Sequence, residues 1–254
     1  MKTNKSRCSI VSIIVAHAML LLTTSGAAAL SSYSENFESL VISDPDALGN
    51  AGWVVYGNVF DPAGNYIYGY GTFPAPNNSG GFSAIAEGEG GPAQGIQQLS
   101  VYSDYNNYDD MGHGGGNLIE SNVFVEQLID AADVGSTWMF TFDAKAGNIL
   151  DFGSATAAAF IKTIDPANGF ALTNIVLVDT TNLLTTWDTF SLTLFIDAGL
   201  TGQLLQFGFL NVATNFDPSG VFYDNVQFAP VPVPAAVWLL LSAVAGMAGL
   251  RRTR

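Results

Sequence analysis

Asp224, in the segment VFYDNVQF, has the clearest chemical implication of any residue in the chain. Strict alternation along this segment puts its side chain on the same face as Phe222, Val226 and Phe228, which should be the apolar face. A carboxylate there needs compensation, because an unpaired buried charge is costly. The body of the chain has only two lysines, which leaves backbone amides or a calcium ion, since calcium prefers oxygen ligands. An aspartate at a strand edge that bonds to a turn is the alternative.

Tyrosines are concentrated in one stretch, because seven of the nine lie between residues 56 and 108, among Asn, Asp and Gly. In YIYGYG, Tyr66, Tyr68 and Tyr70 alternate, so they share one face of the expected strand. Aromatic faces with amides and carboxylates nearby are typical of sugar-binding sites. We therefore take these tyrosines, together with Trp53 of GWVVYGN, as candidate ligand-binding residues. The alternative is that the tyrosines, which favour strands, cap the core.

Catalytic and transition-metal chemistry find little support in the sequence. The segment of residues 103–117 has three aspartates and His113, but it lacks the EF-hand spacing, and a single histidine without cysteine does not indicate zinc. A surface loop is the better interpretation. No G-x-S-x-G motif occurs. A glycosidase needs only two carboxylates, yet Glu87 and Glu89 lie in a turn-like EGEGG segment, so we expect no enzymatic activity.

Strands must position these residues. Thr137–Lys145 alternates with Trp138, Phe140 and Phe142 on one face, and residues 188–197 behave in the same way. Clusters of Gly, Asn, Asp and Pro punctuate the strands, and no long stretch keeps a helical period; even VFVEQLIDAAD favours strand and turn. About ten strands at regular spacing predict an all-β fold, a two-sheet antiparallel sandwich of the jelly-roll type, as one domain spanning residues 30–229.

Charge is sharply segregated along the chain. All 22 acidic residues lie between Glu35 and Asp224, where the only basic residues are Lys145 and Lys162, so this body has a net charge of −20. Such a surface repels phosphate backbones, which excludes nucleic acid as a partner. Cys8, the only cysteine, lies outside the body, which therefore has no disulfide, thiol nucleophile or thiolate metal site.

The two ends have the composition of targeting segments. Residues 1–29 have a basic start, an apolar run over 10–22 and the small residues AAA, which predicts a secretory signal peptide cleaved after Ala29. Residues 230–254 contain an apolar span, 231–250, of about the length that crosses a bilayer. The basic residues that follow it keep the extreme C-terminus cytoplasmic, which places the body outside the inner membrane.

The C-terminal segment VPVPAAVWLLLSAVAGMAGLRR resembles the PEP-CTERM sorting signal of Gram-negative bacteria. The matching positions are a proline motif, a transmembrane helix and an arginine-rich tail, with Val231, Pro232, Pro234, Arg251 and Arg252 as the sorting-motif residues. Val-Pro stands where the name-giving form has Glu-Pro. The resemblance implies export through the secretion translocon, transient anchoring in the inner membrane, and removal of the tail by an exosortase-type sorting protease. A plain C-terminal anchor is the alternative.

The body resembles carbohydrate-binding-module and galactose-binding-like jelly rolls in four segments: NFES, GWVVYGN, VEQLIDAADVGSTWMFTFDAKAGN and VFYDNVQF. In those families a structural calcium often joins the first and last strands. The resemblance therefore implies Glu38 and Asp224 as side-chain ligands of a calcium ion, with backbone carbonyls completing the shell.

These features together predict an exported, non-catalytic protein of the cell surface or extracellular matrix that binds or structures extracellular polysaccharide. Two alternatives stay open. One is a carbohydrate-binding module with a defined glycan ligand. The other is a glycan hydrolase or lyase.

Overall fold

The computed structural model describes residues 29–72, 83–103, 116–151, 153–214 and 217–232. The expected signal peptide, most of the segment 103–117, the side chain of Tyr70, and the sorting residues Pro234, Arg251 and Arg252 lie outside this part of the chain. The α-helix in the described part is α1, Ala47–Asn50, and no helix there has the length and apolarity needed to span a membrane.

Twelve strands form two sheets in the described residues. Sheet A contains β1 (Tyr33–Glu35), β4 (Ala84–Glu87), β5 (Gln97–Val101), β7 (Thr137–Ala146), β10 (Asp188–Phe195) and β12 (Val221–Pro230). Sheet B contains β2 (Trp53–Phe60), β3 (Tyr66–Thr72), β6 (Leu118–Leu128), β8 (Thr156–Asp165), β9 (Ala171–Asp179) and β11 (Leu204–Ala213). Single 3-10 turns lie at Ala131–Asp133, Asn148–Leu150, Pro166–Asn168 and Ala198–Leu200.

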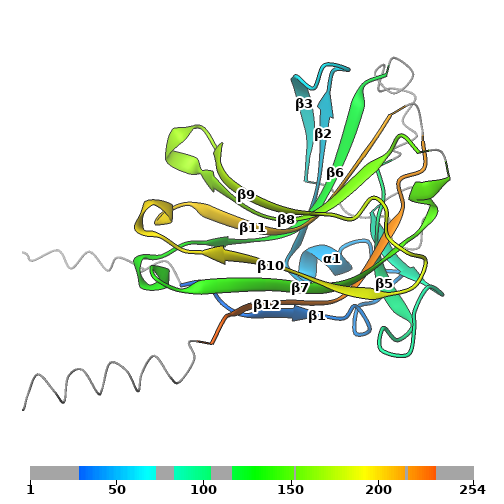
Figure 1. The fold of residues 1–254 in the computed structure, drawn as a ribbon, viewed down its shortest axis with the longest axis horizontal. Helices are drawn as coiled ribbons and strands as arrows, with labels where there is room; N and C mark the ends of the chain where they lie inside the picture. The colour runs from blue at the N-terminus through cyan, green and yellow to red at the C-terminus, as the bar shows by residue number, and fades with distance from the viewer. Residues whose placement is uncertain (1–28, 73–82, 104–115, 152, 215–216, 233–254) are drawn as a thin grey trace, which may run out of the picture.

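All strand pairings are antiparallel, and the two sheets lie face to face as two layers (Figure 1). The order is β10-β7-β12-β5-β4 in sheet A, with β1 paired to β12, and β3-β2-β6-β11-β8-β9 in sheet B. From β6 onward most successive strands switch sheets, which is the connectivity of a jelly roll. The all-β, two-sheet antiparallel sandwich expected from the sequence is confirmed.

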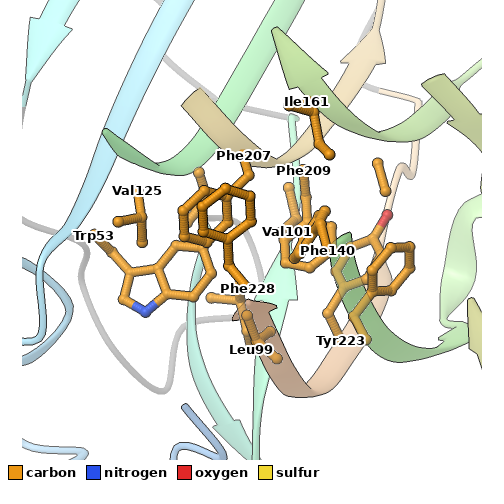
Figure 2. Packing of buried hydrophobic residues seen from close by; sticks show 14 of the residues in the cluster. Trp53, Leu99, Val101, Val125, Phe140, Ile161, Phe207, Phe209, Tyr223 and Phe228 are labelled. Atoms are coloured by element: carbon orange, nitrogen blue, oxygen red, sulfur yellow. The ribbon is translucent and has the colours of Figure 1, made fainter. Parts of the chain in front are cut away.

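The core is an aromatic layer between the sheets (Figure 2). Phe207 of sheet B stacks on Phe228 of sheet A with 4.2 Å between ring centroids, and Phe209 stacks on Tyr223 at 3.7 Å. The alternation read from residues 137–145 holds, because Phe140 is fully buried within this layer. Such inter-sheet aromatic pairs stabilise the fold by more than the burial of their apolar area alone.

Trp53 belongs to this core. The sequence pattern predicts a ligand-facing tryptophan, whereas only 3% of the side chain is exposed and the indole packs edge-on against Tyr33 and parallel to Phe209 (Figure 2). Its place on the inner face follows from the alternation of β2, in which Trp53, Val55 and Val59 are all buried. Trp53 is therefore removed from the candidate ligand contacts.

Asp224 does not share the face expected for it. Asn225 has a positive φ of 48°, and the pairing of β12 with β7 shifts register between Asp224 and Gln227, which is a β-bulge. Tyr223 and Val226 consequently both face the core, and Asp224 lies on the outer face of sheet A. The carboxylate is still fully buried, because other segments cover it on that side.

Candidate functional site

The outer face of sheet B carries a groove that crosses the strands and encloses about 740 Å³. Strand register sets Val54 beside Phe124 in its lining, and Gln206 between Glu126 and Lys162. We call this cavity the sheet B groove. Its lining includes Tyr66, Asn122, Phe124, Glu126, Lys162 and Phe170.

Gly208 makes the floor of the sheet B groove possible. A Cβ at this position would lie 2.2 Å from the carbonyl oxygen of Val123 and 2.6 Å from Cα of Phe124, so no side chain fits. The rings of Phe124 and Phe160 flank the glycine, with centroids 6.4 Å apart. The result is an apolar floor on a face that would otherwise be polar.

Lys162 lies over this floor. Its ammonium is 4.5 Å from the ring centroid of Phe160 and 5.5 Å from that of Phe124, within the range of cation–π interactions. Burial lowers the pKa of Lys162, while the carboxylates of Glu120 and Glu126 partly oppose that effect. The ammonium has no hydrogen-bond acceptor among the described residues, so its donors are available to a ligand.

Asn122 presents an unsatisfied acceptor to the groove. Its Nδ2 donates to Glu120 Oε1 at 2.7 Å, and Asn58 Nδ2 donates to the same oxygen at 2.8 Å. Because an ionised carboxylate only accepts, this contact fixes the amide orientation and turns Asn122 Oδ1 away from Glu120. That oxygen has no hydrogen-bond partner among the residues that the structure describes, and the side chain is only 1% exposed. A buried acceptor of this kind favours a ligand that brings an O–H or N–H donor.

The three tyrosines of YIYGYG do not form one platform. Two register shifts in the β2–β3 pair place Tyr66 opposite Phe60 and Tyr68 opposite Val59. Because Phe60 and Val59 are consecutive, Tyr66 and Tyr68 point to opposite faces of sheet B. Tyr66 is 59% exposed, lines the groove and meets Phe60 edge-on, whereas Tyr68 is 37% exposed and shares the face of Val59. Of the predicted row, the structure brings Tyr66 to the site.

Phe170 lines the opposite end of the groove, and the sequence analysis missed it. It is 63% exposed and has a φ of +60°, which is unusual for a bulky residue. The turn Asp165–Phe170 imposes this conformation: Asp165 accepts from the Ala167 amide, and its carbonyl accepts from the Phe170 amide. An aromatic residue directly after a Pro-Ala-Asn-Gly turn was the available signal. Tyr66 and Phe170 thus place exposed rings on β3 and beside β9, at the two sides of sheet B.

A second arrangement lies on the outer face of sheet A, where Asp143 and Asp224 are direct cross-strand partners. Asp143 is satisfied, because its carboxylate accepts from Gln94, Thr189 and Asn225 at 2.6–2.8 Å. Within the described part of the chain, Asp224 Oδ1 accepts only the adjacent Asn225 amide, and Asp224 Oδ2 is buried without a partner. Burial, together with the charges of Glu38, Asp143 and Glu35, raises the pKa of Asp224 to about 7 against the lowering effect of the Asn225 amide.

Glu38 is held in place by hydrogen bonds from the end of the β4–β5 connection and the start of β5. Its Oε1 accepts the amides of Ile96 and Gln97, both at 2.7 Å, and packs so closely that a Cβ at Gly95 would lie 2.4 Å away. Gly95 also has a φ of +63°, so a side chain there is excluded twice. The predicted pair of calcium ligands is thus Glu38, exposed and anchored by amides, and Asp224, buried with one orphaned oxygen.

The carboxylate oxygens of Glu38 and Asp224 are suitable ligands for a hard cation such as calcium. An ion bound there would also satisfy Asp224 Oδ2, which has no partner among the described residues. Within the described ranges, no three acidic, histidine or cysteine side chains converge as a metal-binding group. An ion held here would therefore depend on backbone carbonyls as well as on these two residues.

A smaller cavity of about 510 Å³ lies beside this region, between Phe222 and Lys145. The Lys145 ammonium is 2.7 Å from Glu89 Oε2 and also lies over the rings of Trp187 and Phe222. Because the lysine already has a carboxylate partner, this cavity offers a ligand less than the sheet B groove does.

No protein-family profile and no curated relative match the sequence. Among solved structures, the chain is similar to the enzymatically active domain of tailspike protein 4 from bacteriophage CBA120 (TM-score 0.43, 11% identity, 76% of this chain and 21% of that one). It is also similar to the CBM22-1 xylan-binding domain of Xyn10C from Paenibacillus barcinonensis (0.39, 12%, 82% and 97%) and to a cyclase from Fischerella sp. TAU (0.40, 15%, 80% and 99%). These likenesses assign no ligand or activity to the chain.

Proposed function

We propose that the chain is a non-catalytic protein that binds an extended, uncharged glycan in the sheet B groove. The observation that carries the proposal is Asn122 Oδ1, a buried acceptor without a partner that lines a groove with an exposed aromatic ring at each side. Sugar hydroxyls supply donors for Asn122 and acceptors for Lys162. Tyr66 and Phe170 supply rings for stacking.

The shape of the groove favours a polymer over a small molecule. Tyr66 lies on β3 and Phe170 beside β9, at opposite ends of a six-stranded sheet. Five spacings of about 4.8 Å separate β3 from β9, and strand register also offsets the two rings along the strands, so a ligand that reaches both spans more than about 20 Å. The body's net charge of −20 favours neutral polymers over polyuronates, because like charges repel.

Affinity electrophoresis through gels containing soluble xylan, mixed-linkage β-glucan, alginate or polygalacturonate tests the proposal. We expect retardation by a neutral polymer and none by the two polyuronates. Phe170→Ala should weaken binding about tenfold, as for an exposed aromatic anchor. Phe195→Ala is the matched control, since Phe195 is a comparably exposed aromatic residue (57%) on β10 of the other sheet. Retardation that Phe170→Ala leaves unchanged would refute the assignment to this groove.

The enzymatic alternative is tested on the same polymers by the release of reducing ends. We expect none, because the groove places Asn122, Lys162 and aromatic rings in its centre rather than two facing carboxylates. Release of reducing ends that is lost with Glu126→Gln would establish a hydrolase or lyase instead.

We further infer that the chain is exported and sorted to the cell surface or extracellular matrix, on the strength of the basic–apolar–small start and the V-P-V-P, apolar and arginine-rich end. Mass spectrometry of the protein recovered from a producing Gram-negative host tests this. A polypeptide beginning at residue 30 and lacking the apolar tail is expected. An intact chain in the cytosol would contradict export, and a retained tail would favour a plain anchor.

A further inference from the structure

Strand β9 forms an open edge of sheet B. Among the described strands it pairs with β8 alone, and it lies at the margin of its layer (Figure 1). The backbone groups on its outer side therefore point away from the sheet, ready to pair with another strand. At nine residues, Ala171–Asp179 is also long for an edge strand.

The other edges of the two sheets carry features that discourage pairing, whereas β9 carries few. β1 and β4 have three and four residues, β3 is interrupted by two register shifts, and β10 presents hydroxyl side chains such as Ser191 and Thr193 to solvent. In β9 one register shift lies near its start, and residues 174–179 pair regularly with β8. Short, irregular or polar edges are the usual protection against association, so this contrast singles out β9.

The solvent face of β9 is apolar up to Asp179 at its end. Leu172, Ile175 and Leu177 are 56%, 42% and 51% exposed, and their β8 partners place them on the outer face of sheet B. Asp179, at the end of β9, is its only charged residue in a body of net charge −20. An acidic protein that leaves one edge with a single charge, at the end of the strand, has a surface that a second copy can approach with little like-charge repulsion.

We propose that two copies of the chain associate through antiparallel β9–β9 pairing. A two-fold register centred on Val176 places Ile175 against Leu177 of the other copy, with both residues on the outer face. It also places Asp179 against Thr173, so the two aspartates do not meet. The pairing is self-complementary, as a two-fold interface requires, and it extends sheet B into one continuous twelve-stranded sheet.

This dimer would give the protein two sheet B grooves on the same face of one sheet. A polymer that reaches both would be held by avidity, which raises apparent affinity without a new contact. That consequence rests on the proposed function. The pairing itself does not.

Sedimentation velocity and light scattering on the full chain, solubilised in dodecyl maltoside, test the pairing from about 1 to 200 µM, because a strand-pair interface smaller than a standard one is expected to be weak. We expect a monomer–dimer equilibrium that strengthens with salt, since salt screens the repulsion between acidic bodies. Leu177→Lys and Ile175→Glu should each leave the protein monomeric at every concentration. Phe195→Lys, a charge placed at a similarly exposed apolar site on β10, should dimerise like the parent.

Hydrogen exchange distinguishes β9 pairing from association through another surface, because only β9 pairing would protect the amides of β9. Amides of residues 174–179 should gain protection as concentration rises, and the strands in the middle of each sheet should not. A parent protein that stays monomeric, or one whose association survives both β9 substitutions, overturns the proposal. A parent protein that binds neutral glycan but stays monomeric up to 200 µM would overturn the pairing alone, whereas a dimer that binds no neutral glycan would leave the pairing intact and remove the proposed function.

Discussion

Asp143 and Asp224 lie directly opposite each other on β7 and β12, as two buried carboxylates of which only Asp143 is fully hydrogen-bonded. Like charges on facing strand positions destabilise a sheet. The bulge at Asn225 keeps Asp224 out of the aromatic core but leaves it beside this second carboxylate.

Stability should therefore fall as the pH rises towards neutrality. The pKa of Asp224 is about 7 in the folded chain against 3.8 ordinarily, so between these values the folded state holds a proton that the unfolded state has released. Its contribution to the free energy of unfolding is greatest near pH 4 and is lost as the pH rises through about 7. Asp224→Asn removes this slope and should stabilise the chain at pH 8 by about 1–4 kcal/mol.

Urea unfolding at pH 5 and pH 8, in the presence of EDTA, measures this difference. The exposed Asp151→Asn serves as the control and should leave the pH dependence as it is. If Asp224→Asn follows the same pH curve as the parent chain, the buried, charge-crowded environment assigned to Asp224 is wrong.

Calcium should raise the melting temperature, because an ion held by Glu38 and Asp224 offsets the burial of an unpaired carboxylate. At a hundredfold excess over its dissociation constant, the ion adds about 2.7 kcal/mol, or roughly 5–10 °C for a domain of this size. The gain should be smaller at pH 5, where Asp224 is protonated, and it should vanish in Glu38→Gln and Asp224→Asn. Identical melting in calcium, magnesium and EDTA would rule the ion out.

Tyr66 and Tyr68 should differ in glycan binding although they are two residues apart. Tyr66 lines the sheet B groove, and Tyr68 pairs with Val59 on the opposite face. Tyr66→Ala is expected to lower the affinity for a neutral glycan about tenfold, and Tyr68→Ala less than twofold. Isothermal titration on folded variants gives both values. Equal losses of affinity in the two variants would support the row of tyrosines on one strand face that simple alternation predicts.

Gly208→Ala should destabilise the chain by about 1–3 kcal/mol, because the added methyl group collides with backbone atoms of β6 that cannot move independently. Gly49→Ala is the matched control, since nothing lies within 4 Å of a Cβ there and the residue is in α1. That control should be neutral or slightly stabilising. Thermal melts that rank the two variants the other way would contradict the close approach of β6 and β11.

The alternation of residues was enough to predict the sandwich, because apolar residues at every second position mark the buried face of a strand. Phe140 and Phe142 lie on the buried face, as the pattern predicts. The same pattern placed Asp224 and the tyrosine row wrongly. A bulge adds one residue to a strand and reverses every later side chain, and nothing in YIYGYG or VFYDNVQF distinguishes a regular strand from a bulged one.

The sheet B groove could not be predicted from the sequence for a different reason. Asn122, Lys162 and Phe170 come from β6, β8 and the turn that follows β8, and they meet only through the order of strands in sheet B. Asn122 and Lys162 are unremarkable in their own segments, and only the turn before Phe170 marks that residue. A single sequence does not reveal which strands are neighbours, so only Tyr66 of the groove residues was identified in advance.

The pairing of β1 with β12 determines where a tether at either end would pull on the body. Tyr33 lies opposite Phe228, so the chain enters and leaves the sandwich at the same strand pair of sheet A. Residues 30 and 31 also bond to Asp133 and Gln127, so a load applied at residue 29 reaches both sheets, whereas a load applied at residue 232 enters through β12 of sheet A. The groove that we propose as the glycan site lies on the outer face of sheet B and would stay clear of a C-terminal tether.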